Sequence, residues 1–261
     1  MPATPVLELR TINKSFGPVQ VLHDVAFSAR AGEVTALVGD NGAGKSTLVK
    51  CIGGIHPIDS GEFFFDGTQV QVNSPRDAAE LGIEIVYQDL ALCDNLDIVQ
   101  NMFLGRERKS GLVLDEPTME EMAATTLSGL SVRTVKSVRQ QVSSLSGGQR
   151  QTVAIAKAVL WNSKVVVLDE PTAALGVAQT QQVLELVRRL ADKGLAVVLI
   201  SHNMNDVFAV SDHIAALYLG RMAAQVKTSD VTYAQIVELI TSGRSGDLGL
   251  GNGDGPNGAK A

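Results

Sequence analysis

The sequence predicts an α/β protein whose mostly parallel sheet is covered by helices on both faces. Short apolar runs rich in β-forming residues recur at 34–38, 83–87, 164–168, 195–200 and 213–219. Most runs are separated by helical patterns, such as VLELVRRLADKG, where apolar residues between Val183 and Leu190 mark one side and Gly194 supplies the stop. Continuous apolar strands that alternate with helices are typical of a parallel sheet buried on both faces.

The segments outside this core differ in character. Near the N-terminus, residues 6–12, 32–39 and 61–70 are strand-like and separated by turn residues, which predicts antiparallel strands beside the parallel core and hence a mixed sheet. Between 89 and 144 the β-type runs stop and helical composition takes over. We therefore expect a core domain from 1–88 and 145–242, a helical insert subdomain at 89–144, and a disordered glycine-rich tail at 243–261.

The overall composition limits the class of protein. A chain of 261 residues with 45% hydrophobic residues can bury a substantial core, and its net charge of -6 argues against a nucleic-acid-binding surface. Cys51 and Cys93 lack the spacing of a metal site or a disulfide framework, so both are expected to be packing residues. No export signal and no apolar run near the ~20 residues of a bilayer span are present, so membrane association is expected to need a partner.

A phosphate-binding loop is predicted at residues 39–47. The segment GDNGAGKST follows an apolar strand and precedes a helical segment, and it matches the pattern of a glycine, four residues, Gly44, Lys45 and Ser46. Backbone N–H groups of such a loop face the β- and γ-phosphates, and the helix dipole adds positive potential there. Lys45 supplies a charge for the outer phosphates and Ser46 a hydroxyl for Mg²⁺. The predicted nucleotide-binding residues here are Gly39, Asp40, Asn41, Gly42, Ala43, Gly44, Lys45, Ser46 and Thr47.

The pentapeptide LDEPT occurs twice, and its neighbours distinguish the two copies. Four apolar residues, 165–168, lead into Asp169 and Glu170, as a buried central strand requires. Only three apolar residues separate Asp115 and Glu116 from the charged segment RERKSG, so this copy is predicted to begin a helix with Asp115 as its N-cap. We therefore predict that Asp169 holds Mg²⁺ and that Glu170 is the general base for the attacking water.

The segment LSGGQ, residues 145–149, narrows the class further. It opens a helix, and a serine hydroxyl with glycine N–H groups at a helix N-terminus forms an anion site. LSGGQ behind a phosphate loop, followed about twenty residues later by a strand ending in DEPT, resembles the ATP-binding subunit of ABC (ATP-binding cassette) transporters. The resemblance covers roughly residues 6–240. It implies the P-loop NTPase fold of ABC ATPases, with a RecA-like parallel core, an antiparallel part and a helical insert.

The resemblance also implies roles for residues outside these motifs. It implies a homodimer of cassettes in which each ATP lies between the phosphate loop of one copy and the LSGGQ of the other, namely Ser146, Gly147, Gly148 and Gln149. Phe16 resembles the aromatic residue that stacks on adenine, although an exposed aromatic at a strand end is the alternative. Gln88 resembles the glutamine that reaches Mg²⁺ and the attacking water. His202 resembles the histidine that contacts the γ-phosphate.

Other segments resemble the carbohydrate-import branch of the family. They are GDNGAGKST, VYQDLAL, NMFLGRE, SHNMNDVF and TAALGV. The resemblance implies a single-cassette ATPase of the ribose, xylose or fructose type, which powers monosaccharide uptake through separate transmembrane permease subunits and, indirectly, a solute-binding protein. Its expected location is the cytoplasmic face of the cell membrane. Gly176 stands where many ABC subunits carry an aspartate that crosses the dimer interface, so the resemblance does not extend to that contact.

Four alternative functions differ from this interpretation in the sequence features that they require. An ABC ATPase outside transport usually carries two cassettes or long coiled-coil insertions, and an importer subunit for a different small solute would share every motif named above. A GTPase would need an NKxD-type contact, whereas Asn13-Lys14 is followed by Ser15-Phe16. A catalytically silent binding module would be expected to lack Lys45 or Glu170, and both are present.

Overall fold

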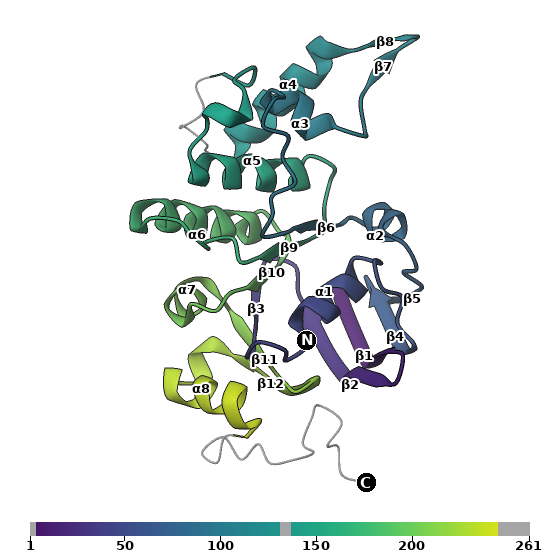
Figure 1. The fold of residues 1–261 in the computed structure, drawn as a ribbon, viewed down its shortest axis with the longest axis vertical. Coiled ribbons are helices and arrows are strands. Elements are labelled where there is room, and N and C mark those ends of the chain that lie inside the picture. Colours follow the sequence, from purple (N-terminus) through teal and green to yellow (C-terminus); the bar gives the residue numbers. More distant parts are fainter. Residues whose placement is uncertain (1–3, 131–136, 245–261) are drawn as a thin grey trace.

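A six-stranded mixed sheet forms the centre of the molecule in the computed structural model, which describes residues 4–130 and 137–244 (Figure 1). Its strand order is β12-β11-β3-β10-β9-β6, and every neighbouring pair is parallel except β11 and β12. The strands are β3 (Val34–Val38), β6 (Ile83–Val86), β9 (Val165–Asp169), β10 (Ala196–Ile200), β11 (His213–Tyr218) and β12 (Arg221–Lys227). The predicted parallel core is confirmed.

A second, antiparallel sheet lies beside it, with strand order β2-β1-β4-β5. Its strands are β1 (Leu7–Phe16), β2 (Val19–Ala29), β4 (Ser60–Phe65) and β5 (Thr68–Val70). The predicted antiparallel part is therefore present in residues 6–12 and 61–70, whereas β3, within residues 32–39, pairs in parallel with β10 and β11, as its apolar run indicated. Strands β2 and β12 were missed, because polar residues break up their apolar pattern and no continuous run marks them.

The helices cover both faces of the six-stranded sheet. They are α1 (Lys45–Ile52), α2 (Pro75–Leu81), α3 (Ile98–Phe103), α4 (Glu116–Gly129), α5 (Gly147–Val159), α6 (Val177–Asp192), α7 (Met204–Val210) and α8 (Tyr233–Ser242), with short 3₁₀ turns at Val142–Ser144 and Thr228–Asp230. Along β9, Val166 and Leu168 pack into the cluster that includes α5 and α6, while Val165 and Val167 face the antiparallel sheet and α1. Burial on both faces explains the uninterrupted apolar runs.

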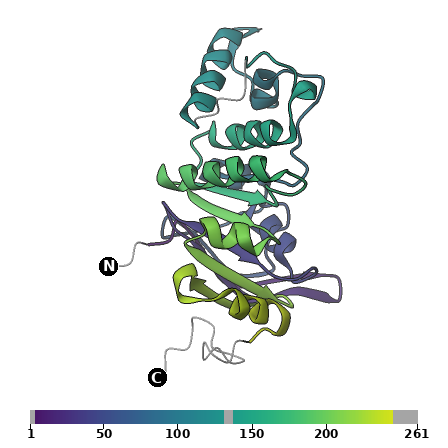
Figure 2. The same cartoon turned by 90° about the vertical axis from the view of Figure 1, so that its left-hand side faces the viewer.

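The segment between β6 and β9 stacks in layers above the sheet. In both ribbon views α5 lies between α6 and the pair α3 and α4 (Figure 2). The stretch at 89–144, predicted as a helical insert, contains helices α3 and α4 and also a short hairpin of β7 (Lys109–Ser110) and β8 (Val113–Leu114). Strands of two residues carry too little pattern to be recognised in a sequence.

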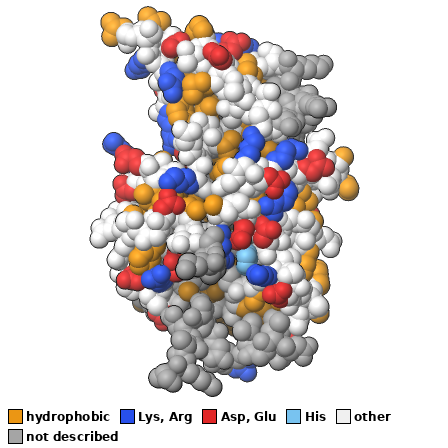
Figure 3. All heavy atoms as spheres, turned by 180° about the vertical axis from the view of Figure 1, so that it is seen from behind, with side chains coloured by type: hydrophobic (Ala, Val, Ile, Leu, Met, Phe, Trp, Pro, Cys, Tyr) orange, Lys and Arg blue, Asp and Glu red, His pale blue; other side chains and the backbone are white. Residues whose placement is uncertain are grey.

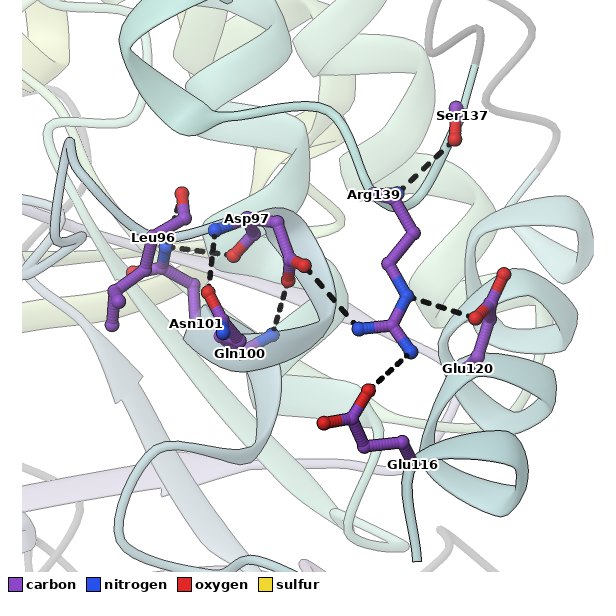
Figure 4. Close-up of polar contacts among 8 residues, drawn as sticks. All are labelled: Leu96, Asp97, Gln100, Asn101, Glu116, Glu120, Ser137 and Arg139. Carbon is purple, nitrogen blue, oxygen red and sulfur yellow. Dashed lines mark hydrogen bonds and ion pairs between the residues drawn. The ribbon is translucent and has the colours of Figure 1, made fainter.

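Ion pairs organise this layer around Arg139. Its Nε donates to Glu120 at 2.8 Å, and its two terminal nitrogens lie 3.1 Å from Glu116 and 3.4 Å from Asp97 (Figure 4). Asp97 is the N-cap of α3 and accepts a hydrogen bond from the backbone N–H of Gln100 at 2.7 Å. Arg139 thus ties the chain that leads to LSGGQ to the first turns of both α3 and α4.

Charged side chains of both signs lie on the surface, and a glycine ends the last helix. The face shown in Figure 3 carries acidic and basic side chains side by side. In the described ranges, no helix has both the length and the apolar composition that a membrane span needs. Gly243 caps α8 in the left-handed region, with φ 72°, and the predicted tail from residue 245 onward lies outside the described residues.

Candidate active site

Four segments of the predicted site leave the same edge of the six-stranded sheet. The phosphate loop follows β3, Gln88 lies two residues after β6, Glu170 directly follows β9, and His202 lies two residues after β10. The register places Ile200 of β10 opposite both Leu37 of β3 and Asp169 of β9. Ligands of parallel α/β sheets bind beyond the carboxyl ends of the strands, and this edge collects the predicted phosphate, metal and water-activating groups.

The phosphate loop needs its glycines for space as well as for conformation. A Cβ atom at Gly39 would collide with the backbone oxygen of Leu217 in β11, and one at Gly44 would come within 2.9 Å of the Leu22 side chain. Gly42 and Gly44 have φ values of 80° and 105°, which side-chain-bearing residues rarely adopt. The curled backbone therefore depends on glycine at three of its positions, and it leads directly into α1, which begins at Lys45.

Lys45 is buried and turned into its own loop. Its Nζ donates to the backbone oxygens of Gly39 at 2.8 Å and Asp40 at 3.1 Å. Burial lowers the pKa of this ammonium, while the charges of Glu170, Asp40 and Asp169 act in the opposite direction. The ammonium thus lies within the electrostatic reach of both acids at the end of β9, Asp169 and Glu170, as a group shared between phosphate and metal sites requires.

Asp169 and Glu170 are both partly buried carboxylic acids. Burial raises the pKa of each one, and the neighbouring Lys45 and His202 partly offset that shift. Glu170 has φ 51°, and its backbone N–H donates to the oxygen of Ile200 at 3.0 Å, which holds it against β10. Two acids one residue apart are thus presented differently, one as the last residue of a strand and one in a strained turn.

His202 lies beside Glu170. Its Nε2 is 3.2 Å from Oε1 of Glu170, but this contact does not have hydrogen-bond geometry, so among the described residues the buried Oε1 has no hydrogen-bond partner. The side chain of Glu170 is 16% exposed and that of His202 is 51% exposed. A buried carboxylate oxygen without a hydrogen bond can accept one from a bound water.

The first LDEPT copy, which contains Asp115 and Glu116, lies at the start of α4, and the predicted helix cap at Asp115 is confirmed. The side chain of Asp115 accepts a hydrogen bond from the backbone N–H of Thr118 at 3.3 Å and caps α4, while Glu116 forms an ion pair with Arg139. Met119, Ala123 and Leu127 bury the predicted apolar side of the helix.

Phe16 and Gln88 occupy exposed positions. Phe16 ends β1, is 44% exposed, and packs edge-on against His56 with ring centroids 5.0 Å apart. Gln88 is exposed. Burial raises the pKa of its neighbour Tyr87, and the negative charge of Asp169 raises it further, so this segment lies near Asp169. Adenine stacking by Phe16 and metal binding by Gln88 stay predictions.

Ser146 begins α5 as predicted and remains exposed. Its hydroxyl accepts from the backbone N–H of Gln149 at 3.4 Å, and its own N–H donates to Oε1 of Gln149 at 2.9 Å. The glycines lie in close contact with neighbouring side chains, because a Cβ atom at Gly147 would come within 3.2 Å of Leu175 and one at Gly148 within 3.2 Å of Gln179. The LSGGQ helix therefore starts at the surface and against the segment that follows Glu170.

Gly176 is the N-cap of α6. Its φ of −72° and ψ of 160° are open to any residue, and a Cβ atom there would meet nothing within 4 Å. The backbone does not require glycine at this position. A partly buried hydrogen bond near the site, from the Thr172 hydroxyl to Asp206, was not predicted from the sequence. The only sequence feature that could have indicated it is the acidic residue four positions after His202.

Known proteins match this arrangement along most of the chain. The ABC transporter family profile matches residues 22–173. The xylose/arabinose import ATP-binding protein XylG of Sulfolobus acidocaldarius is 45% identical over 246 residues, covering 94% of this chain and 98% of that protein. The fructose import ATP-binding protein FrcA of Rhizobium meliloti is 45% identical over 251 residues, covering 94% and 96%. A solved dimeric ATP-binding cassette in a post-hydrolysis state, bound to ADP and Pi, matches with a TM-score of 0.70 and 25% identity over 85% of this chain and 98% of that one.

Proposed function

This chain belongs to the ABC transporter family, and on that premise we propose that it is the ATP-hydrolysing subunit of an importer that takes up a monosaccharide. The comparisons confirm the family and the cassette fold expected from the sequence. The two relatives are named for the import of xylose or arabinose and of fructose, and each has about the length of this chain, as a single cassette should. Separate permease subunits, an external solute-binding protein and a position at the cytoplasmic face of the membrane complete the proposal.

The observation that carries the proposal is the common sheet edge of the phosphate loop, Asp169, Glu170 and His202. The loop N–H groups and Lys45 would hold the β- and γ-phosphates of ATP. Because Lys45 already donates to the oxygens of Gly39 and Asp40, an entering phosphate would exchange neutral acceptors for charged ones, which bind an ammonium more strongly.

The donor set fits Mg²⁺. The Ser46 hydroxyl, the Asp169 carboxylate and the Gln88 side-chain oxygen are hard oxygen ligands. Burial raises the pKa values of Asp169 and Glu170, and a bound cation would stabilise their ionised forms. Bound there, Mg²⁺ would neutralise charge on the outer phosphates. Glu170 would accept the proton of the attacking water at its buried oxygen Oε1, and His202 would donate a hydrogen bond to the γ-phosphate.

Turnover is proposed to need two copies of the chain. The exposed N-terminus of α5 supports this, because Ser146 and Gly147 lie at the surface, where the phosphates of a second copy could reach them. Closure of the dimer around two ATP molecules, followed by hydrolysis and reopening, would drive the permease subunits.

Two experiments test the function. The phosphate-release rate per subunit should rise with protein concentration, whereas a constant rate from a confirmed monomer would reject the shared site. In the source organism, loss of this chain should abolish uptake of one labelled monosaccharide among xylose, arabinose, ribose, fructose and galactose. Return of the wild-type chain should restore uptake, and return of Glu170→Gln should not. Unchanged uptake of all five sugars would reject monosaccharide import.

A further inference from the structure

A buried carboxylate outside the predicted site joins two of its loops. Asp206, in the first turn of α7, is 6% exposed. Its Oδ2 accepts a hydrogen bond from the hydroxyl of Thr172 at 2.7 Å, and its Oδ1 accepts one from the side-chain amide of Asn203 at 3.1 Å. A buried carboxylate is stable only when such donors satisfy it, so the geometry of both donors is tied to Asp206.

The two donors belong to the loops that carry the catalytic candidates. Thr172 lies two residues after Glu170, and Asn203 directly follows His202. The backbone N–H of Asn203 also donates to the Ser201 hydroxyl at 3.0 Å, which holds the His202 loop on its other side. Asp206 is therefore a single group that sets the distance between the loop after β9 and the loop after β10.

Glu170 needs such support. Its φ of 51° is unfavourable for a residue with a Cβ atom and persists only where the surroundings hold it. Its Oε1 has no hydrogen bond within the described part of the chain, so the position of the carboxylate depends on its own backbone and on the backbone of His202. Burial raises the pKa of the carboxyl group, and the hydrogen bond from the His202 backbone partly offsets that shift. Three contacts fix the backbone of Glu170: the N–H of Glu170 to the oxygen of Ile200, the N–H of Ala173 to the oxygen of Glu170, and the side-chain bond from Thr172 to Asp206.

We propose that Asp206 is a positioning residue for hydrolysis, which acts through Thr172 and Asn203 to hold Glu170 and His202 facing the same water. The inference rests on the proposed function, since it assumes that Glu170 is the base. Asp206 itself does not touch the reacting atoms.

The first test removes one hydroxyl group. Thr172→Val keeps the side-chain shape and breaks the bond to Asp206, so kcat should fall about 10- to 100-fold, the scale of a misplaced catalytic group. KM for ATP should change less than ~3-fold, because binding rests on the phosphate loop. Thr172→Ser restores the hydroxyl and should return kcat to within ~3-fold of wild type. The control Thr241→Val removes a hydroxyl that bonds only within α8, to the oxygens of Val237 and Glu238, and should leave kcat unchanged.

A second background distinguishes positioning from a general structural effect. In Glu170→Gln, the base is already absent, so adding Thr172→Val should cause a smaller further loss of kcat than in the wild type, namely the part that acts through His202. If Thr172→Val does not fold, Asp206→Asn is measured in the same two backgrounds with the same expected results.

The outcomes separate this inference from the proposed function. Slow Glu170→Gln with normal Thr172→Val and Asp206→Asn would overturn the positioning role alone. A full further loss in the Glu170→Gln background, or a loss confined to KM, would also overturn it. Normal turnover by Glu170→Gln would overturn the proposed base and this inference together.

Discussion

Replacing Glu170 by glutamine separates catalysis from folding at this site. The change keeps the shape of the side chain, which is 16% exposed at the end of β9, and removes its capacity to accept a proton. We expect the variant to bind ATP normally and to hydrolyse it at least ~100-fold more slowly, the lower end of the range for losing a general base. A 100-fold loss corresponds to about 2.7 kcal/mol of barrier.

Stability should move in the opposite direction to activity. Burial raises the pKa of Glu170, so this group favours the folded state below its ordinary pKa of 4.5 and loses that contribution as pH rises through the raised pKa. At neutral pH the ionised carboxylate is therefore unfavourable in the folded state. The neutral glutamine removes that cost, and the midpoint of thermal unfolding at pH 7 should be equal to or above that of the wild type.

The first LDEPT copy supplies a matched control. Glu116→Gln makes the same chemical change in the same pentapeptide, at a side chain that is 58% exposed and paired with Arg139. An exposed ion pair contributes about 0–1 kcal/mol, so turnover should stay within ~2-fold of wild type. Phosphate release at fixed protein concentration, ATP binding and thermal unfolding are measured for all three proteins.

Two results would refute the reasoning. Near-normal turnover by Glu170→Gln would show that this residue is not the base. Equal losses in Glu170→Gln and Glu116→Gln would show that the two copies of the pentapeptide had not been distinguished correctly.

Three further predictions concern pH, the phosphate loop and the helix cap. Because the pKa of Glu170 is raised and the base must be ionised, kcat measured against pH should fall on the acid side at a pH above 4.5; an acid limb at or below 4.5 would contradict this. Gly39→Ala, whose methyl group meets the Leu217 oxygen, should lower the free energy of unfolding by about 1–3 kcal/mol and weaken ATP binding, as urea titration and a fluorescent ATP analogue would report. Gly42→Ala meets no atom within 4 Å and should cost less. Asp115→Ala should cost about 1 kcal/mol in urea titration through loss of the α4 cap, with phosphate release kept within ~2-fold.

Much of the site could be predicted because its motifs are contiguous. The phosphate loop lies between a strand and a helix that immediately flank it, and the apolar run before Asp169 marks a buried strand without knowledge of its neighbours. The cap at Asp115 was confirmed for the same reason, since a cap involves residues within one turn.

Strand direction and partners could not be predicted in the same way. Residues 34–38 were predicted as a core strand beside some antiparallel strands, but no local signal showed that β3 lies between β10 and β11, far along the chain. The pattern of β3 shows that it is buried, and burial alone does not say which strand lies beside it. Strands β2 and β12 and the hairpin of β7 and β8 gave even weaker signals, because they are half-buried or only two residues long.

The sequence by itself determined which groups are proposed for the chemistry: a phosphate loop, the two carboxylates after a buried apolar run, and an LSGGQ helix, each encoded by neighbouring residues. Only the tertiary structure decided how those groups meet. Thr172 and Asp206 are 34 positions apart, and Glu170 and His202 come together because β9 and β10 are adjacent. Contacts of that kind depend on strand pairing and helix packing across the whole chain, and no local pattern of residues records them.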